Sequence, residues 1–178
     1  AWIGFVPILA VLPLLSRRGA TILGFSVGFS LCAVLQSWFP GLIARFGNFH
    51  PALAIGLTVV LLVFQALGWA LVMWLIRDLW KRVPMVVSAP ILFVAYEVWF
   101  PMVFRGPLGL TQYRSLHLLQ IGELGGASAV TGLLVLIGAL VAETLWFRRT
   151  SRRWALGSLV AGSSFLALCL IFGHQRIS

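Results

Sequence analysis

Six apolar stretches, separated by short polar junctions, follow one another along the chain. They cover approximately residues 1–15, 20–39, 52–76, 84–104, 124–147 and 154–173. A helix needs about 20 mostly apolar residues to cross a bilayer. The pattern therefore predicts an all-α integral membrane protein, a single polytopic domain over residues 1–178 with about six transmembrane helices. The more polar segment 105–123, between the fourth and fifth helices, is predicted to be an interfacial linker.

The start of the chain differs from the other stretches. The first apolar run is short for a full crossing, and the chain opens on Ala1 rather than on a methionine. We therefore expect a processed or partial chain from which a preceding helix has been lost.

Small residues and prolines indicate how the predicted helices begin and pack. Gly24 and Gly28 have the small-x-x-x-small spacing that lets two helix backbones approach closely in lipid. Pro51 is suited to the first position of a helix, where its missing N–H would be unpaired in any case, and Arg45 is predicted to lie in the loop before it. Glu123 precedes a double glycine at a position where a carboxylate favours a helix N-terminus.

Composition and charge agree with a membrane protein. Hydrophobic residues make up 61% of the chain, charged residues 10%, and the mean hydropathy is +1.03. The formal charge of +9 comes from basic residues clustered between apolar stretches, so we expect it to report topology and not a nucleic-acid partner. Nine of the 13 lysines and arginines fall in the junctions after the first, third and fifth stretches, which assigns those junctions to the cytoplasm. The linker and the C-terminus are then periplasmic, and the membrane is a bacterial inner membrane.

Glu97 is the most unusual residue within an apolar stretch. A carboxyl group there is costly and so predicts a functional site. The candidates for binding a lipid or another substrate are this glutamate and the polar residues of the linker: Glu97, Arg105, Gln112, Arg114, His117 and Gln120. An arginine-lined pocket would suit an anionic head group, whereas a buried carboxyl that only fixes helix packing explains Glu97 equally well. The sequence leaves both interpretations open.

Nothing in the sequence predicts a catalytic residue, a metal site or a cofactor. Cys32 and Cys169 lie in apolar stretches without metal-ligand spacing, which is typical of packing residues. An intramembrane serine protease would have a glycine directly after its serine and a histidine within a membrane stretch. Neither accompanies Ser128, which argues against a serine nucleophile. His117 is more typical of a solvated loop than of a general base, and Glu143 is expected to pair with the nearby Arg148 and Arg149.

Several of these segments, in the same order along the chain, resemble the membrane portion of apolipoprotein N-acyltransferase. The segments are Pro90 through Glu97-Val98-Trp99, Arg105-Gly106-Pro107, Gly109-Leu110-Thr111-Gln112, and Gln120 through Gly126 followed by Thr131. The opening, from Ala1 to Pro7, and the segment Gly24 to Gly28 are similar to the early helices of that family. The resemblance covers nearly the whole chain.

The resemblance implies a function that this chain would share with other parts of a larger protein. The family transfers an acyl chain from a phospholipid to the amino-terminal cysteine of bacterial lipoproteins, through a thioester on a cysteine of a periplasmic nitrilase-like domain. The implied partners are therefore a phospholipid, a lipoprotein acceptor and a nitrilase-like domain or chain. The glutamate, lysine and cysteine of that domain have no counterpart here, so we expect no acyltransferase activity from this chain alone.

Three departures from the family pattern support an alternative. Phe100 stands where an arginine is usual, Leu108 where a tryptophan follows proline, and Gly138 where an asparagine is typical. A diverged, non-enzymatic helical subunit that packs with partner subunits in a larger membrane complex would tolerate these changes. The sequence leaves open whether the chain is part of an enzyme.

Overall fold

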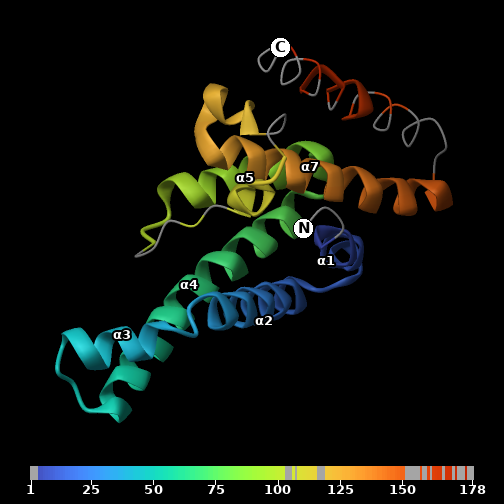
Figure 1. Cartoon of the computed structure of the whole chain (residues 1–178). Coiled ribbons are helices and arrows are strands. Elements are labelled where there is room, and N and C mark those ends of the chain that lie inside the picture. The colour runs from blue at the N-terminus through green and yellow to red at the C-terminus, as the bar shows by residue number, and fades with distance from the viewer. Residues whose placement is uncertain are drawn as a thin grey trace. The chain divides into compact units, whose positions relative to one another are not determined.

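The computed structural model describes residues 4–102, 106, 108–115 and 119–150, together with residues 157, 160, 162–165, 167–169, 171 and 175. In this part of the chain the regular structure is helical throughout, without a strand (Figure 1). The chain divides into two compact units, one made of Ala1–Leu14 and Ile76–Ser178 and the other of Leu15–Leu75. We refer to them as the α5–α7 unit and the α2–α4 unit, after the helices that dominate each.

The elements of each unit follow the apolar stretches of the sequence. The α2–α4 unit contains α2 (Arg17–Leu35), α3 (Phe39–Phe46) and most of α4 (Pro51–Leu79). The α5–α7 unit contains α1 (Phe5–Val11), η1 (Leu12–Leu14), α5 (Met85–Trp99), η2 (Leu108–Gln112) and α7 (Gly122–Thr150).

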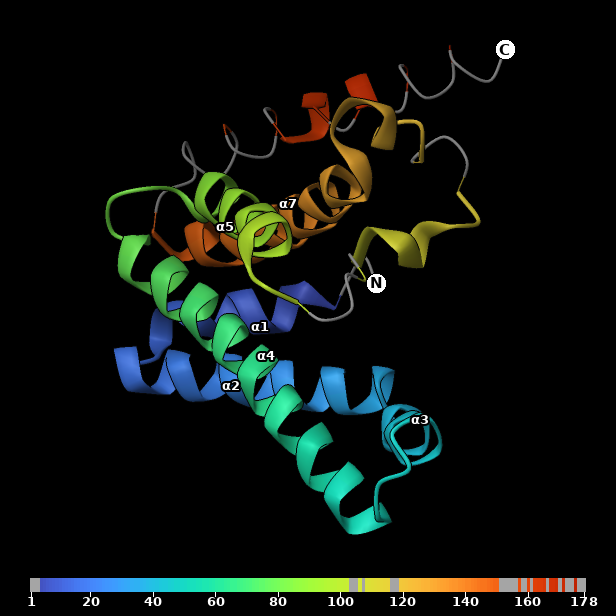
Figure 2. The same cartoon turned by 90° about the vertical axis from the view of Figure 1, so that its left-hand side faces the viewer.

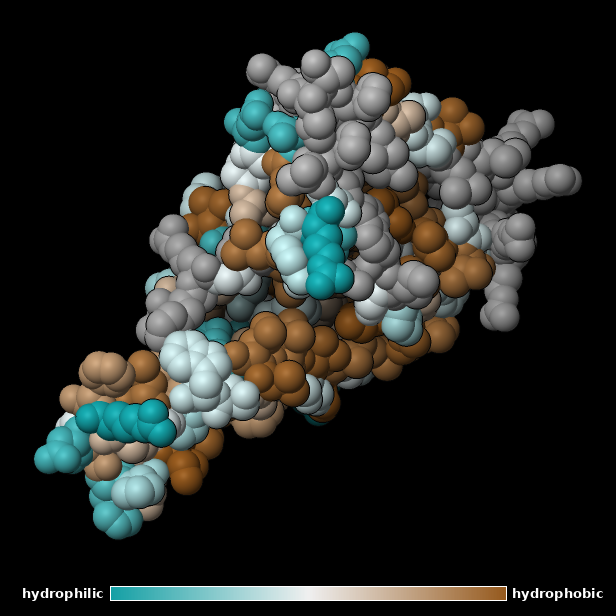
Figure 3. Space-filling model, viewed as in Figure 1, coloured by the Kyte–Doolittle hydropathy of each residue, from teal (hydrophilic) through white to brown (hydrophobic). Residues whose placement is uncertain are grey.

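Three of the described helices are long and apolar enough to cross a membrane: Arg17–Leu35, Pro51–Leu79 and, within α7, Gly125–Trp146. Phe5–Leu14 and Met85–Trp99 are apolar but shorter. Figure 3 shows hydrophobic residues over most of the visible surface along α2. The all-helical, apolar character of the chain is confirmed, whereas the count of six crossing helices and the interfacial linker remain predictions. Half of the sixth stretch, 154–173, lies outside the described residues.

The α2–α4 unit is held together by close approach of its two long helices, which lie side by side in Figures 1 and 2. A Cβ atom added at Gly24 would lie 2.7 Å from the carbonyl oxygen of Trp69 and 2.9 Å from Cα of Ala70. One added at Gly28 would lie 2.6 Å from the Trp69 side chain. Only glycine allows this approach, so the small-residue spacing is confirmed as a helix contact.

A buried amide pair joins the same two helices. Nε2 of Gln36 donates to Oε1 of Gln65 at 2.9 Å, and Nε2 of Gln65 donates to Oε1 of Gln36 at 3.2 Å. The thiol of Cys32 lies 3.7 Å from the same Gln65 oxygen. Gln36 and Gln65 are 8% and 3% exposed, and the reciprocal bonds supply each amide with a partner as burial requires.

The connection between α2 and α4 differs from the predicted loop, because it contains the short helix α3. Arg45 therefore lies in the last turn of a helix. The prediction that Pro51 begins the next helix is confirmed. His50 precedes that proline, and its Nδ1 accepts a hydrogen bond from the backbone N–H of Ala52 at 3.3 Å.

In the α5–α7 unit, α5 lies beside α7, and α1 also packs on α7 (Figures 1 and 2). The rings of Phe5 and Phe93 meet edge to face with centroids 5.1 Å apart. Nε1 of Trp146 donates to the carbonyl oxygen of Ala10 at 2.7 Å. Gly138 leaves room for α1, because a Cβ atom there would lie 2.6 Å from Cβ of Phe5.

The double glycine interrupts α7 near its start. Gly125 (φ −152°, ψ 24°) and Gly126 (φ 69°, ψ −172°) have non-helical backbone angles. A positive φ strains residues with a side chain but not glycine. Glu123 lies in the first turn of α7, as its expected position at a helix N-terminus requires.

Candidate functional site

Glu97 lies near the C-terminal end of α5, where its side chain is 9% exposed. Oε1 accepts a hydrogen bond from the backbone N–H of Leu108 at 2.9 Å. The hydroxyl groups of Ser128 and Thr131, on α7, lie beside the carboxyl group. Oε2 is buried without a hydrogen bond of good geometry to any described residue. The carboxyl group therefore holds the linker with one oxygen and retains unused capacity on the other.

The next residue of the linker is tied to α7. The backbone N–H of Gly109 donates to Oγ1 of Thr131 at 2.7 Å. A Cβ atom at Gly109 would overlap the carbonyl oxygen of Ala127 and lie 2.8 Å from Cβ of Val130. The absence of a side chain thus lets η2 settle against α7, and two consecutive N–H groups anchor it to both helices.

The hydrogen bonds of the other predicted site residues in the described part of the chain go to partners other than Glu97. Gln112 is buried, and its Nε2 donates to Oγ1 of the neighbouring Thr111 at 3.1 Å. Arg114 is exposed; its Nε donates to the hydroxyl of Tyr113 at 3.1 Å, and its guanidinium lies 5.5 Å from that ring's centroid. The backbone oxygen of Gln120 accepts from Glu123 N at 3.1 Å. Arg105 and His117 lie outside the described residues.

Thr131 is a site residue that the sequence does not single out. Ser128 and Thr131 are three residues apart on α7 and therefore share a face of that helix. This spacing can be read from the sequence, but it points to a site only if α5, with Glu97, packs against that face of α7. Hydroxyl residues are common in membrane helices, so the spacing alone does not identify a partner for Glu97.

Glu143 is a second buried carboxyl group on α7, and it is 1% exposed. Its Oε2 accepts a hydrogen bond from the backbone N–H of Val86 at 3.1 Å, and the N–H of Met85 also bonds to the carboxyl group. It therefore accepts hydrogen bonds from backbone N–H groups at the start of α5, and its pairing with the nearby arginines stays a prediction. The side chains of Arg148 and Arg149 lie outside the described part of the chain.

A groove of about 710 Å³ runs along α5 and α7 and has an almost wholly apolar lining. Its wall includes Val86, Pro90, Val94 and Trp99 on α5 and Gly132 and Leu136 on α7. The α5 wall extends from Val86 to Trp99, about 20 Å at the helical rise of 1.5 Å per residue. Each leaflet contributes about half of the 30 Å hydrocarbon core, so the groove is long enough for an extended acyl chain.

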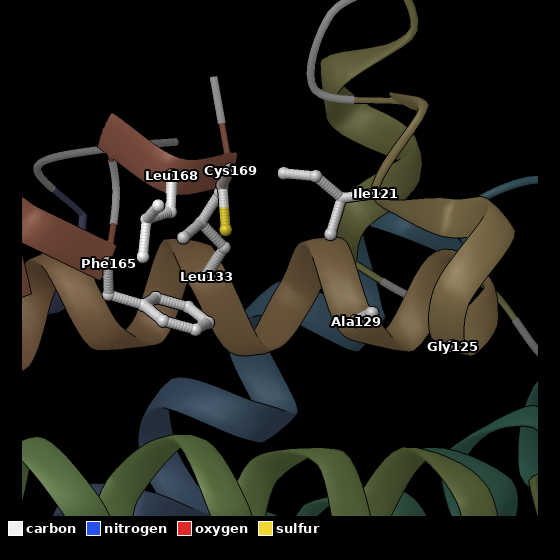
Figure 4. Close-up of a pocket in the computed structure, with 7 residues that line it drawn as sticks. All are labelled: Ile121, Gly125, Ala129, Leu133, Phe165, Leu168 and Cys169. Atoms are coloured by element: carbon white, nitrogen blue, oxygen red, sulfur yellow. The ribbon is translucent and has the colours of Figure 1, made fainter. Parts of the chain in front are cut away.

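A smaller cavity, of about 450 Å³, lies on α7 under the C-terminal segment. Figure 4 shows Leu133 of α7 beside Leu168 and Cys169, with the sulfur of Cys169 pointing toward the helix. Ile121 lies at the other end of the cavity. The lining is apolar, which makes this cavity an extension of the helix packing and not a polar site.

The titratable and nucleophilic side chains of the described residues lie apart from one another or in the packing of the helices. None of them form a group of three or more His, Cys, Asp or Glu side chains suited to a metal ion. Ser128 lies beside a carboxyl group, and the one described histidine, His50, accepts a bond at the start of α4. Cys32 and Cys169 are free thiols. The arrangement offers an apolar groove and a buried carboxyl oxygen.

Comparison with known proteins identifies the relatives of this chain. A family model described as the apolipoprotein N-acyltransferase N-terminal domain matches residues 1–140. A protein of Geobacter metallireducens named apolipoprotein N-acyltransferase is 27% identical over 184 residues, covering 99% of this chain and 35% of that protein. A protein of the same name from Gloeobacter violaceus is 31% identical over 178 residues, covering 93% of this chain and 33% of that protein.

These matches cover only part of the relatives' length. The chain spans about a third of the length of the curated relatives that it matches. No solved structure is significantly similar to it. The relatives are longer, which is consistent with a further domain in those proteins.

Proposed function

The chain belongs to the apolipoprotein N-acyltransferase family, and we propose that it acts as the membrane domain of such an enzyme. In this role it binds the phospholipid acyl donor and the lipoprotein acceptor for acyl transfer to an N-terminal cysteine. The chemistry is supplied by a nitrilase-like domain or chain that carries the catalytic glutamate, lysine and cysteine. No cofactor or metal ion takes part in this proposal.

The groove along α5 and α7 is the observation that carries the proposal. It is apolar along its length, and its length fits an acyl chain of one leaflet. At the end marked by Trp99, the same two helices hold Glu97 and Thr131, which anchor the linker. We infer that the acyl chain occupies the groove while the phospholipid head group lies at the level of the linker.

The polar candidates divide by role within this proposal. Glu97 positions the linker through Leu108, and Gln112 is buried within the linker. Arg114 is exposed and carries the permanent charge that suits a phosphate group, and Arg105 and His117 are assigned to the same head-group region. Gln120, next to the start of α7, completes the set.

Location follows from the same proposal. We place the chain in the bacterial inner membrane with the linker and Ser178 on the periplasmic side. Fusion of alkaline phosphatase after Ser178 tests this topology, because that enzyme becomes active only after export. A cytoplasmic fluorescent protein at the same site is the matched control and is expected to stay dark. The reverse pattern would contradict the assigned orientation.

The test of function is a chimera in which this chain replaces the matching third of the Geobacter metallireducens relative. We expect the chimera to restore lipoprotein N-acylation in a strain depleted of its own acyltransferase. Ile91→Trp places a bulky ring in the groove wall, at a position 61% exposed, and is expected to reduce acylation at least about tenfold. Val141→Trp, on the exposed part of α7 outside the groove, is the matched control.

The outcomes separate the enzyme domain from the alternative. If a chimera that accumulates in the membrane at normal levels leaves acylation unrestored, the chain is better explained as a non-enzymatic helical subunit of a larger membrane complex. The departures at Phe100, Leu108 and Gly138 favour that alternative. If Ile91→Trp and Val141→Trp acylate equally well, the groove is not the acyl-chain site.

A further inference from the structure

The position of α3 in the chain indicates its depth in the membrane. It lies in the connection from residue 36 to residue 50, between α2 and α4, which are both long and apolar enough to cross a bilayer. The connection between two consecutive crossing helices must lie at one face of the bilayer. The position of α3 along the chain therefore places it at a membrane–water interface.

The side chains of α3 are arranged for such a position. Phe39, Leu42, Ile43 and Phe46 follow the i, i+3, i+4, i+7 spacing that gathers them on one face of a helix. The opposite face carries Gly41 and Arg45. An amphipathic helix with aromatic and aliphatic residues on one face and a basic residue on the other is typical of a segment lying in the interfacial plane.

No residue of α3 is fully buried, although Phe39, Leu42 and Ile43 are half-buried against the chain. Phe46 is 86% exposed, and the flanking Trp38 and Phe49 are 52% and 45% exposed. An isolated helix shorter than about 12 residues is marginal in water, so an eight-residue helix needs a surface to pack against. If α2 and α4 cross the bilayer, the lipid that surrounds their outer sides also extends beside α3. The exposed side of α3 can therefore pack against that lipid.

The charge of the segment around α3 indicates which lipids it would bind. Residues 36–50 contain no aspartate or glutamate, and Arg45 is their one arginine or lysine. Arginine near a membrane surface is attracted to anionic lipid, and its forked guanidinium suits phosphate. In Figure 3, hydrophilic residues gather around α3 beside hydrophobic ones.

From these observations we propose that α3 is an interfacial anchor that lies in the plane of the membrane. The exposed Phe46, with the flanking Trp38 and Phe49, inserts at the boundary of the acyl chains, and Arg45 contacts the phosphates of anionic lipids. Phe39, Leu42 and Ile43 are half-buried and contribute only their exposed edges. The proposal concerns the α2–α4 unit and is independent of the acyl groove along α5 and α7.

Spin labels on opposite faces of α3 test the orientation. The natural thiols are removed by Cys32→Ala and Cys169→Ala, and single cysteines are introduced by Phe46→Cys or, as the matched control, by Gly41→Cys. A side chain at Gly41 meets nothing within 4 Å, so this label leaves the packing unchanged. The full chain is reconstituted in vesicles of phosphatidylcholine and phosphatidylglycerol, and its helical content is checked by circular dichroism.

We expect the label at residue 46 to collide mainly with oxygen, which partitions into lipid, and the label at residue 41 mainly with a water-soluble nickel complex. Equal access of both labels to the nickel complex would show that α3 stands off the membrane, and equal access to oxygen would show that it is embedded in the core. Either result overturns the proposal.

A second variant tests the contribution of charge. In the Phe46→Cys background, Arg45→Glu is expected to shift the label toward the nickel complex in vesicles that contain phosphatidylglycerol. In vesicles of phosphatidylcholine alone, the shift should be much smaller. An equal shift in both lipids, or none in either, would contradict a role for anionic phosphates.

Discussion

The two units place buried polar groups between their helices in different ways. In the α2–α4 unit, Gln36 and Gln65 form a closed pair in which each amide donates to and accepts from the other. In the α5–α7 unit, Glu143 and Glu97 accept hydrogen bonds from backbone N–H groups of α5 and of the linker. The first arrangement joins two helices symmetrically, and the second fixes the ends of segments.

This difference indicates where the chain has capacity for a ligand. A reciprocal amide pair uses the facing groups of both side chains, so it is best explained by packing. The carboxyl of Glu97 bonds Leu108 through one oxygen, while the other oxygen is buried without a bond of good geometry among the described residues. A buried polar atom of this kind requires an explanation, and a functional role is one of the recognised explanations.

The largest effect on stability is expected for Glu143→Ala. The substitution leaves the buried N–H groups at the start of α5 without their acceptor and opens a cavity at a position 1% exposed. We expect the free energy of unfolding to fall by about 3 kcal/mol. The measurement is reversible unfolding in mixed micelles, followed by circular dichroism. Glu143→Gln retains an acceptor oxygen and should lose clearly less; equal losses would indicate that the charge, and not the hydrogen bond, is required.

A smaller loss is expected for Gly24→Ala. The new methyl group would meet backbone atoms of Trp69 and Ala70, which cannot move without shifting the helix. We expect a loss of about 2 kcal/mol in the same unfolding measurement. Gly56→Ala, on α4, is the matched control because nothing lies within 4 Å of that site; it should be neutral or slightly stabilising. An unchanged stability of Gly24→Ala would contradict the close contact of α2 with α4.

The amide pair is expected to contribute less still. Interhelical hydrogen bonds in membrane proteins contribute about 1 kcal/mol or less, so Gln65→Leu should lower the free energy of unfolding by about 1 kcal/mol. Because Gln36 loses its partner in that variant, the double variant Gln36→Leu with Gln65→Leu should be no less stable than the single one. A double-mutant cycle measures this coupling. Strictly additive losses would show that the two amides do not act as a pair.

Much of the helical framework could be predicted from the sequence because it follows from local or pairwise rules. The apolar stretches predict the helices, Pro51 starts α4, and the spacing of Gly24 and Gly28 matches their contact with α4. The short helix α3 was predicted as a loop because Pro40, Gly41 and the polar residues after it are typical of turns. Its amphipathic spacing covers only eight residues, too few for a clear periodic signal.

The site was less predictable than the fold. Glu97 stands out in the sequence because a charge in an apolar stretch is costly, but its partners do not. Leu108 contributes a backbone N–H, which every residue except proline carries, and Thr131 is one hydroxyl among several in apolar helices. Val86, whose backbone N–H donates to Glu143, lies 57 residues away in the sequence, and no local pattern points to it. Such contacts depend on which helices become neighbours, and composition does not specify that.

The smallest effect is expected for Glu97→Gln, and it tests the contrast between the closed pair and the open carboxyl group most directly. The amide oxygen can still accept from Leu108 N, and its N–H₂ group can donate to the hydroxyls of Ser128 or Thr131. We therefore expect the free energy of unfolding to change by less than about 1 kcal/mol, whereas Glu97→Ala, which releases the linker, should lose about 2 kcal/mol. Both are measured as above, and lipoprotein acylation is measured in the chimera. Normal stability with reduced acylation in Glu97→Gln would assign the unused oxygen to the ligand, and normal stability with unchanged acylation would show that Glu97 only holds the linker.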